Sequence, residues 1–156
     1  MIKGLHHNAY RCRDSEETRQ FYEGFLGLPF VKAFEITETK TGRKTSVLHS
    51  FYQMGDGSFL AFFEAPDYPF DFKDQHDYDL HIALEVDTLH TMFARGKAEG
   101  IETRGIADHG FVQSIYFRDP NGYVIELAAR TASDDVPLAE AKSGARQALD
   151  AWQTSK

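Results

Sequence analysis

Apolar and polar residues alternate along several short stretches of the chain. Between these stretches, apolar residues recur every three or four positions instead. In the first half, residues 4–14 contain a short apolar run that predicts a strand. Asp14 with Glu17 resembles a capping box, and the helix that it predicts stops at Gly27. Three further strands are expected at residues 28–38, 43–54 and 58–64, separated by hairpin-type turns. The first half therefore has the order βαβββ.

The same order of elements begins again near residue 80. Residues 80–87 predict a strand, and Asp87 is expected to cap a helix that Gly100 ends. Strands are expected to follow near residues 101–106, 111–118 and 123–129. The second half is therefore also βαβββ.

The two halves can be superposed residue by residue, which indicates an internal repeat. At the first strands His7 falls on His81, and at the last strands Ala61 falls on Glu126. An α+β fold follows, in which two βαβββ modules form one domain over residues 1–130. The modules span about residues 1–64 and 80–130.

Two segments lie outside the repeat. Residues 65–79 contain five Asp together with Tyr and Phe and have no clear period, so they form either a loop over a pocket or a solvated linker. Residues 131–156 open with the helix-start signal TASDDVP and continue with apolar residues at steps of three and four. This tail predicts one amphipathic helix, and Gly144 inside it costs roughly 1 kcal/mol relative to Ala. The helix is therefore expected to dock on its own domain or on another subunit.

Composition narrows the classes of partner. The 156 residues carry 17 Lys and Arg against 24 Asp and Glu, a net charge of -7, which disfavours nucleic acid and anionic membrane surfaces and favours a small-molecule ligand. No apolar stretch approaches the roughly 18 residues that span a bilayer, and no signal-peptide core opens the chain. The single cysteine, Cys12, excludes an internal disulfide. We expect a cytoplasmic protein.

Glu126 is the residue that most needs an explanation. It lies inside the apolar run of RDPNGYVIEL, and an ionised carboxylate buried there needs a cation. If the first strands of both modules lie side by side, His7 and His81 can meet Glu126 in one cleft. Two imidazoles and one carboxylate form a facial triad that suits Fe(II), Mn(II) or another divalent first-row ion. The remaining candidates are interpreted as surface or hydrogen-bonded histidines: His6, His49, His76 and His90.

At these residues the sequence resembles the vicinal oxygen chelate superfamily, which includes glyoxalase I, fosfomycin and bleomycin resistance proteins, methylmalonyl-CoA epimerase and extradiol dioxygenases. The resemblance covers about residues 4–130. Its motifs are the first-strand His, FYEGFLGLPF, HIALEVD and FRDPNGYVIEL. It implies paired modules whose curved sheets surround a metal-binding cleft, and it assigns the metal to His7, His81 and Glu126.

Ala61 helps to distinguish between the activities found in this superfamily. The resemblance implies that glyoxalase I and the epimerase take a fourth ligand, Glu or Gln, from this position, and Ala61 cannot supply one. The stretch from His109 through Tyr116 to Glu126 resembles the extradiol signature, in which the His is an acid/base group and the Tyr contacts the substrate oxygen. Ala107 and the short His-to-Tyr spacing depart from that signature. Two simpler interpretations therefore remain open: that His109 is an ordinary loop histidine and that Tyr116 only packs against its neighbours.

The resemblance favours an extradiol-type dioxygenase that cleaves a catecholic or similar substrate with O2. It implies one divalent metal, with Fe(II) first and Mn(II), Zn(II) or Ni(II) as alternatives, catalytic residues His109 and Tyr116, and a homodimer. Phe59, Ala61 and Phe63 are expected to line the substrate pocket. The alternatives are a glyoxalase-like isomerase or lyase, and a drug-binding resistance protein without catalysis.

Overall fold

The computed structural model describes residues 1–131 and 138–156. It contains two modules in which helices and strands follow in a similar order. The first module comprises β1 (Tyr10–Arg11), α1 (Ser15–Arg19), the π-helix η1 (Gln20–Phe25), β2 (Phe30–Glu38), β3 (Lys44–Gln53) and β4 (Phe59–Glu64). The second comprises β5 (His81–Glu85), α2 (His90–Ala98), β6 (Thr103–Asp108), β7 (Val112–Arg118) and β8 (Val124–Arg130). The last element is α3 (Leu138–Ser155).

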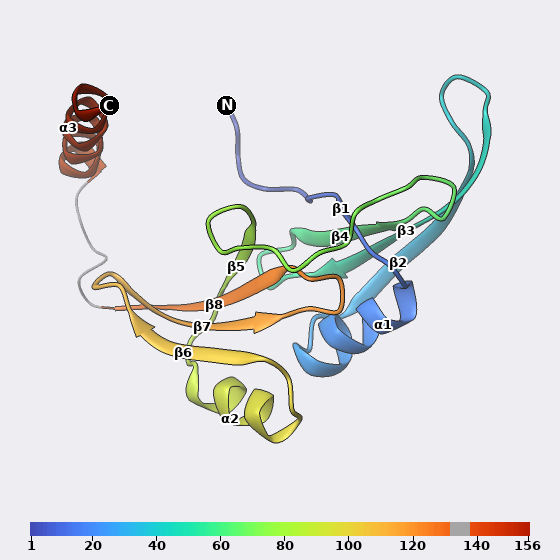
Figure 1. Cartoon of the computed structure of the whole chain (residues 1–156), viewed down its shortest axis with the longest axis horizontal. Helices are drawn as coiled ribbons and strands as arrows, with labels where there is room; N and C mark the ends of the chain where they lie inside the picture. The colour runs from blue at the N-terminus through green and yellow to red at the C-terminus, as the bar shows by residue number, and fades with distance from the viewer. Residues whose placement is uncertain (132–137) are drawn as a thin grey trace.

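Each module folds into its own four-stranded mixed sheet (Figure 1). The strand orders are β1-β4-β3-β2 and β5-β8-β7-β6, so the last strand of each module lies beside the first. That contact is parallel in both sheets, and the other strand pairs are antiparallel. The α+β fold with two βαβββ modules is therefore confirmed.

The register of the strands supports the superposition of the two halves. His7 forms a parallel bridge with Phe59, and His81 pairs in parallel with Val124. Phe59 and Val124 are equivalent positions in the repeat, and so are the two histidines. The superposition therefore holds at the level of backbone pairing, and it places Glu126 two residues beyond the partner of His81.

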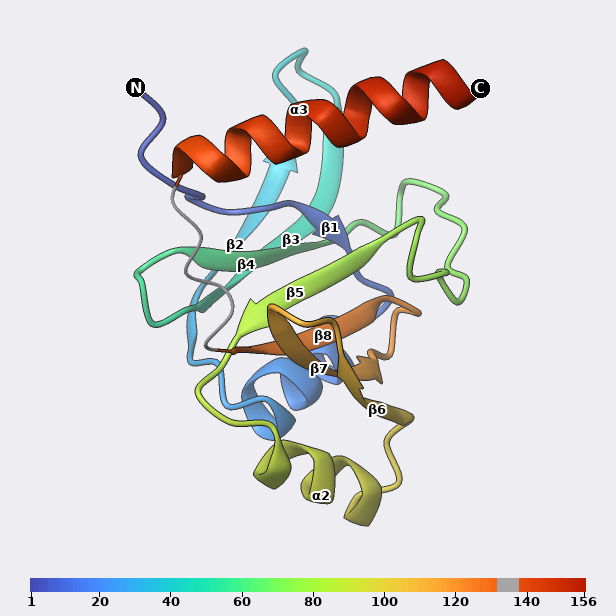
Figure 2. The same ribbon diagram turned by 90° about the vertical axis from the view of Figure 1, so that its left-hand side faces the viewer.

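Residues from both modules form one hydrophobic core. The buried ring of Phe25 packs edge-on against Phe117, with 5.0 Å between their centroids. The buried Tyr22 hydroxyl donates a hydrogen bond to Asp119 at 2.9 Å. Figure 2 shows η1 and α2 on the side of the molecule away from α3. The modules are therefore fixed to each other through their helices and the 119–122 turn.

The structure confirms one of the two expected helix caps and contradicts the other. Asp14 caps α1 as expected, since its side chain accepts a hydrogen bond from the Glu17 backbone N–H at 2.8 Å. The prediction that Asp87 caps α2 is wrong. That helix begins at His90 after Leu89, whose side chain is buried in the core and makes no cap hydrogen bond. Burial of an apolar side chain has overridden the preference for a polar cap.

The C-terminal helix α3 stands apart from both sheets in Figure 1. The residues of this helix from Glu140 onward are exposed, including Leu149 and Trp152 of its apolar face. The expected helix-start signal lies almost wholly in residues 132–137, outside the described residues. Within the described parts of the chain, no helix is long and apolar enough to cross a membrane.

Candidate metal centre

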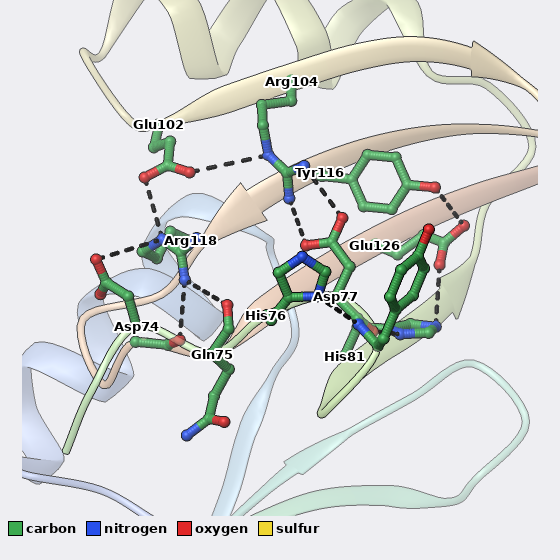
Figure 3. A network of polar contacts seen from close by, with 12 residues as sticks. Asp74, Gln75, His76, Asp77, His81, Glu102, Arg104, Tyr116, Arg118 and Glu126 are labelled. Carbon is green, nitrogen blue, oxygen red and sulfur yellow. Dashed lines mark hydrogen bonds and ion pairs between the residues drawn. The ribbon is translucent and has the colours of Figure 1, made fainter.

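Glu126 lies in the middle of β8, and two hydroxyl groups of β7 contact one of its oxygens. Figure 3 shows the contact with Tyr116. The Ser114 hydroxyl donates to Glu126 Oε1 at 2.5 Å, and the Tyr116 hydroxyl donates to the same oxygen at 3.3 Å. Pairing of Tyr116 with Glu126 across the two strands explains why these side chains meet. Oε1 therefore accepts hydrogen bonds from both hydroxyl groups, whereas Oε2 accepts neither of them.

The imidazole of His81 faces this second oxygen. Its Nδ1 atom lies 2.7 Å from the backbone oxygen of Asp77, which can only accept a hydrogen bond, so Nδ1 carries the proton. In the neutral ring, Nε2 then has a free lone pair, and this atom lies 3.4 Å from Glu126 Oε2. Two hydrogen-bond acceptors face each other, and a cation between them or a proton on the ring is needed to satisfy both.

The donor set and its spacing fit a divalent metal ion. Zinc, for example, binds imidazole nitrogen and carboxylate oxygen at about 2.0 to 2.2 Å, so two such ligands in a tetrahedral arrangement lie about 3.3 to 3.6 Å apart. The 3.4 Å between His81 Nε2 and Glu126 Oε2 falls in that range. The hydrogen bond that His81 donates to the Asp77 backbone oxygen and the one that Ser114 donates to Glu126 are also the kind of outer contact that holds metal ligands in place.

His7, the third expected ligand, lies on the first sheet. Its ring lies against Phe51 and His49, with centroid distances of 5.7 Å and 6.2 Å, and its Nδ1 atom is 2.8 Å from that of His6. Among the described residues, no three His, Cys, Asp or Glu side chains gather closely enough to hold a metal within one chain. One chain therefore brings together His81 and Glu126 and leaves His7 elsewhere, and the triad stays a prediction.

A pocket of about 600 Å³ opens beside Glu126 and His81. Its polar lining comes from these two residues together with His109, Tyr116 and Asp77, and the remainder is mostly apolar: Tyr78, Ala83, Ala107, Phe111, Val112 and Ala128. The His109 Nε2 atom lies 2.8 Å from the Tyr116 hydroxyl. Burial and the nearby Glu126 carboxylate raise the pKa of Tyr116, so its phenol stays protonated. Contacts within hydrogen-bonding distance therefore run from His109 through Tyr116 to Glu126.

The three residues expected to bind substrate lie on the first sheet, away from this pocket. Phe63 stacks face to face on His49 with 3.7 Å between centroids, and Phe59 lies 6.0 Å from Phe51. Ala61 is fully buried, and its backbone N–H and C=O both bond the Asn8 side chain. These residues do not line the Glu126 pocket of the same chain, and their role stays a prediction.

Two residues of the site were missed from the sequence. Ser114 could have been found, because it precedes Tyr116 by two residues and so shares a strand face with it. Asp77 acts through its backbone oxygen, which depends on the path of the 65–79 segment and leaves no pattern in the sequence. Asp77 and Tyr78 belong to the pocket lining, which agrees with the expectation that this segment forms a loop over a pocket.

The fold and the His–Glu pair define a class of paired βαβββ proteins, and comparison with known families identifies it. Residues 4–127 match the Glyoxalase/Bleomycin resistance protein/Dioxygenase superfamily, and the chain belongs to this superfamily. A lactoylglutathione lyase of Neisseria meningitidis serogroup A is 27% identical over 139 residues, which cover 84% of this chain and 94% of the relative. The metallothiol transferase FosB of Shouchella clausii is 26% identical over 147 residues, covering 86% and 85%.

A solved structure shares the fold. The fosfomycin resistance protein FosX of Listeria monocytogenes, crystallised with Mn(II) and sulfate, superposes with a TM-score of 0.61 at 24% identity. The match covers 85% of this chain and 96% of that protein. At this identity the likeness supports the fold, and the function must be argued from the site.

Proposed function

We propose that this protein is a metal-dependent enzyme acting on a small substrate that bears two neighbouring oxygen atoms. The observation that carries the proposal is the pair of acceptor atoms, His81 Nε2 and Glu126 Oε2, that face each other at 3.4 Å beside an open pocket. A divalent first-row ion satisfies both, and manganese, iron, zinc and nickel are all suited to an imidazole and carboxylate set.

The third ligand in this proposal is His7 of a second copy, in a homodimer. His7 and its aromatic neighbours occupy one face of the first sheet, whereas His81 and Glu126 occupy a face of the second. Several large apolar side chains of the first module are more than a third exposed, namely Phe30, Val31 and Phe34. A dimer that lays the first sheet of one copy over the second sheet of the other covers them and completes the triad.

The residues around the metal have separate tasks. A bound ion would polarise the substrate oxygens as a Lewis acid. Ser114 holds Glu126 through Oε1, so that Oε2 remains directed to the metal. Tyr116 and His109, 2.8 Å apart, can donate and accept a proton at the edge of the pocket. The alanines of the lining leave room for a substrate beside these groups.

Among the reactions of the superfamily, we infer isomerisation or addition rather than ring cleavage. The relatives described above are a lyase and a metallothiol transferase, and neither name indicates ring cleavage of a catechol. Ala61, at the position equivalent to Glu126, supplies no fourth protein ligand, so a chelating substrate keeps two or more positions on the ion. This open set agrees less well with a lyase that takes a fourth protein ligand, Glu or Gln, at this position, and it is compatible with both a transferase and a dioxygenase.

Extradiol ring cleavage by Fe(II) and O2 is the second candidate, and one contact favours it. The His109 imidazole bonded to the Tyr116 hydroxyl resembles the acid/base pair that such a reaction needs. A third outcome, drug binding without turnover, predicts a bound metal or ligand and no product.

One assay separates these candidates. The protein loaded with Mn(II) or Fe(II) is tested for oxygen uptake with a panel of catechols, for formation and breakdown of lactoylglutathione, and for consumption of fosfomycin with a thiol. We expect turnover without oxygen uptake, and we expect His81→Ala to abolish it. His90→Ala is the matched control, because His90 is an exposed first residue of α2. Unchanged turnover in the His81 variant would refute the metal centre, and oxygen uptake would select ring cleavage.

A further inference from the structure

We propose that the ion pair between Arg104 and Asp77 positions His81 for metal binding. Arg104 is then a positioning residue that touches neither metal nor substrate. The inference rests on the proposed function to the extent that His81 is taken to be a ligand. It names two residues, one on β6 and one in the linker, that the sequence did not single out.

Asp77 connects Arg104 to His81 through two different groups (Figure 3). Its carboxylate receives two hydrogen bonds from the Arg104 guanidinium, at 2.8 Å and 3.1 Å, and these bonds lower the pKa of Asp77. Its backbone oxygen accepts the Nδ1 hydrogen of His81 at 2.7 Å. The bidentate pair fixes the orientation of Asp77, and the orientation of its peptide group fixes the imidazole.

Arg104 also contacts the other functional strand. The carbon at the centre of its guanidinium lies 5.2 Å from the centroid of the Tyr116 ring, which is a cation–π distance. Arg104 and Tyr116 pair across β6 and β7, so this contact is built into the register. One side chain therefore holds both the segment that orients His81 and the phenol that contacts Glu126.

The linker is held by backbone hydrogen bonds on both sides of Asp77, and the Asp77 carboxylate ties this turn to Arg104 of β6. The Gln75 N–H donates to the Gly122 backbone oxygen at 2.8 Å, and Arg118 donates to the Gln75 backbone oxygen at 3.2 Å. Three residues lie between Asp77 and His81, and the Asp79 and Leu80 N–H groups donate to the His76 backbone oxygen at 2.9 Å and 3.1 Å. Without the Arg104 contact, the turn at residues 76–80 is no longer held against β6, and the Asp77 peptide can shift with it.

The consequence of losing this anchor concerns the tautomer of His81. With no acceptor at Nδ1, the neutral ring can carry its proton on Nε2, and that atom then cannot bind a metal. The ion pair itself is partly exposed, with 45% of the Arg104 side chain and 33% of the Asp77 side chain accessible, so it adds little to folding. Metal affinity should therefore fall much more than stability.

The test compares Mn(II) binding by calorimetry in the wild type, Arg104→Met, Asp77→Ala and the double variant. We expect each single variant to bind about 10- to 100-fold more weakly, as is typical for outer contacts of metal ligands. The double variant should be no weaker than the singles, because all three lack the same pair. Arg146→Met is the matched control, since its partner Asp150 lies on α3 and its affinity should not change.

A second measurement needs no metal and no activity. Nitrogen-15 spectra of the apo protein report which nitrogen of His81 is protonated, and we expect Nδ1 in the wild type and a mixture in Arg104→Met. Wild-type Mn(II) affinity together with an unchanged tautomer in the Arg104 and Asp77 variants would overturn the inference. Absence of binding in the wild type would instead overturn the proposed function, and the tautomer would still test the anchor. Asp77→Ala decides the matter if Arg104→Met does not fold.

Discussion

At the scale of single residues, the two oxygens of Glu126 explain why a strand can bury an acid. Oε1 accepts hydrogen bonds from the hydroxyl groups of Ser114 and Tyr116, whereas Oε2 faces the Nε2 atom of His81. The protein thus provides hydroxyl donors for one oxygen and places an imidazole nitrogen opposite the other. That asymmetry aims the free lone pairs of the carboxylate at one place, which is what a metal ligand requires.

Removing the Ser114 hydroxyl should weaken metal binding. In Ser114→Ala, Oε1 keeps only the longer bond from Tyr116, so the carboxylate is held less firmly and we expect about tenfold lower Mn(II) affinity by calorimetry. Ser50→Ala is the matched control, because this buried strand serine occupies the first sheet and its hydroxyl has no partner among the described residues. Equal affinities in wild type and Ser114→Ala would contradict the role of Oε1.

The sequence predicted part of this site for physical reasons. Glu126 and His81 could be chosen because burial of a charge demands a partner and because the repeat marks equivalent positions. The contacts of Asp77 and Arg104 could not, since they depend on where a linker without regular structure crosses β6. The separation of His7 from the other two residues could not be predicted either, because pairing within each module does not fix how the modules face each other.

At the scale of elements, the strands agree closely with the alternation of apolar residues, and the ends of elements agree less well. β3 and β4 begin only one residue after their expected positions. The agreement is close because side chains alternate between the two faces of a strand, and this period of two is clear in the sequence. β1 is only two residues long, although a longer apolar run predicted it. Before Tyr10 the backbone pairs with β4 at the His7 bridge, and Asn8 bonds the Ala61 backbone of β4 through its side chain.

The repeat offers a test of how the linker packs on the 119–122 turn. Gly122 has a φ of +92°, and an added Cβ would lie 2.3 Å from the Lys73 backbone oxygen. Gly57, its counterpart in the first module, has a φ of +85° with nothing within 4 Å. Gly57→Ala should cost about 1 to 2 kcal/mol of unfolding free energy, from the left-handed backbone alone. Gly122→Ala should cost about 1 to 3 kcal/mol more, because the linker must also move.

Urea unfolding of the two variants measures this difference directly. Equal losses of unfolding free energy in the two variants would mean that the linker does not contact the 119–122 turn closely in solution. A larger loss for Gly122→Ala would place the linker where the structure has it, directly ahead of Asp77 and His81.

At the scale of the whole molecule, each chain carries two incomplete halves of the proposed centre. The second module offers His81, Glu126 and a pocket, and the first offers His7 beside an aromatic face. Both modules share one core, so neither half can swing freely to meet the other within the chain. In the proposed homodimer, association of two copies would join the halves without any change of fold.

The most direct test of the central claim is the metal content of mixed dimers. His7→Ala and His81→Ala chains are refolded separately and together with Mn(II), and bound metal is measured after desalting. We expect each variant alone to lack tightly bound metal and the mixture to regain it, because a mixed dimer unites His81 and Glu126 of one chain with His7 of the other. A mixture that stays empty, while wild type refolded in the same way binds about one ion per chain, would contradict a centre shared between two copies.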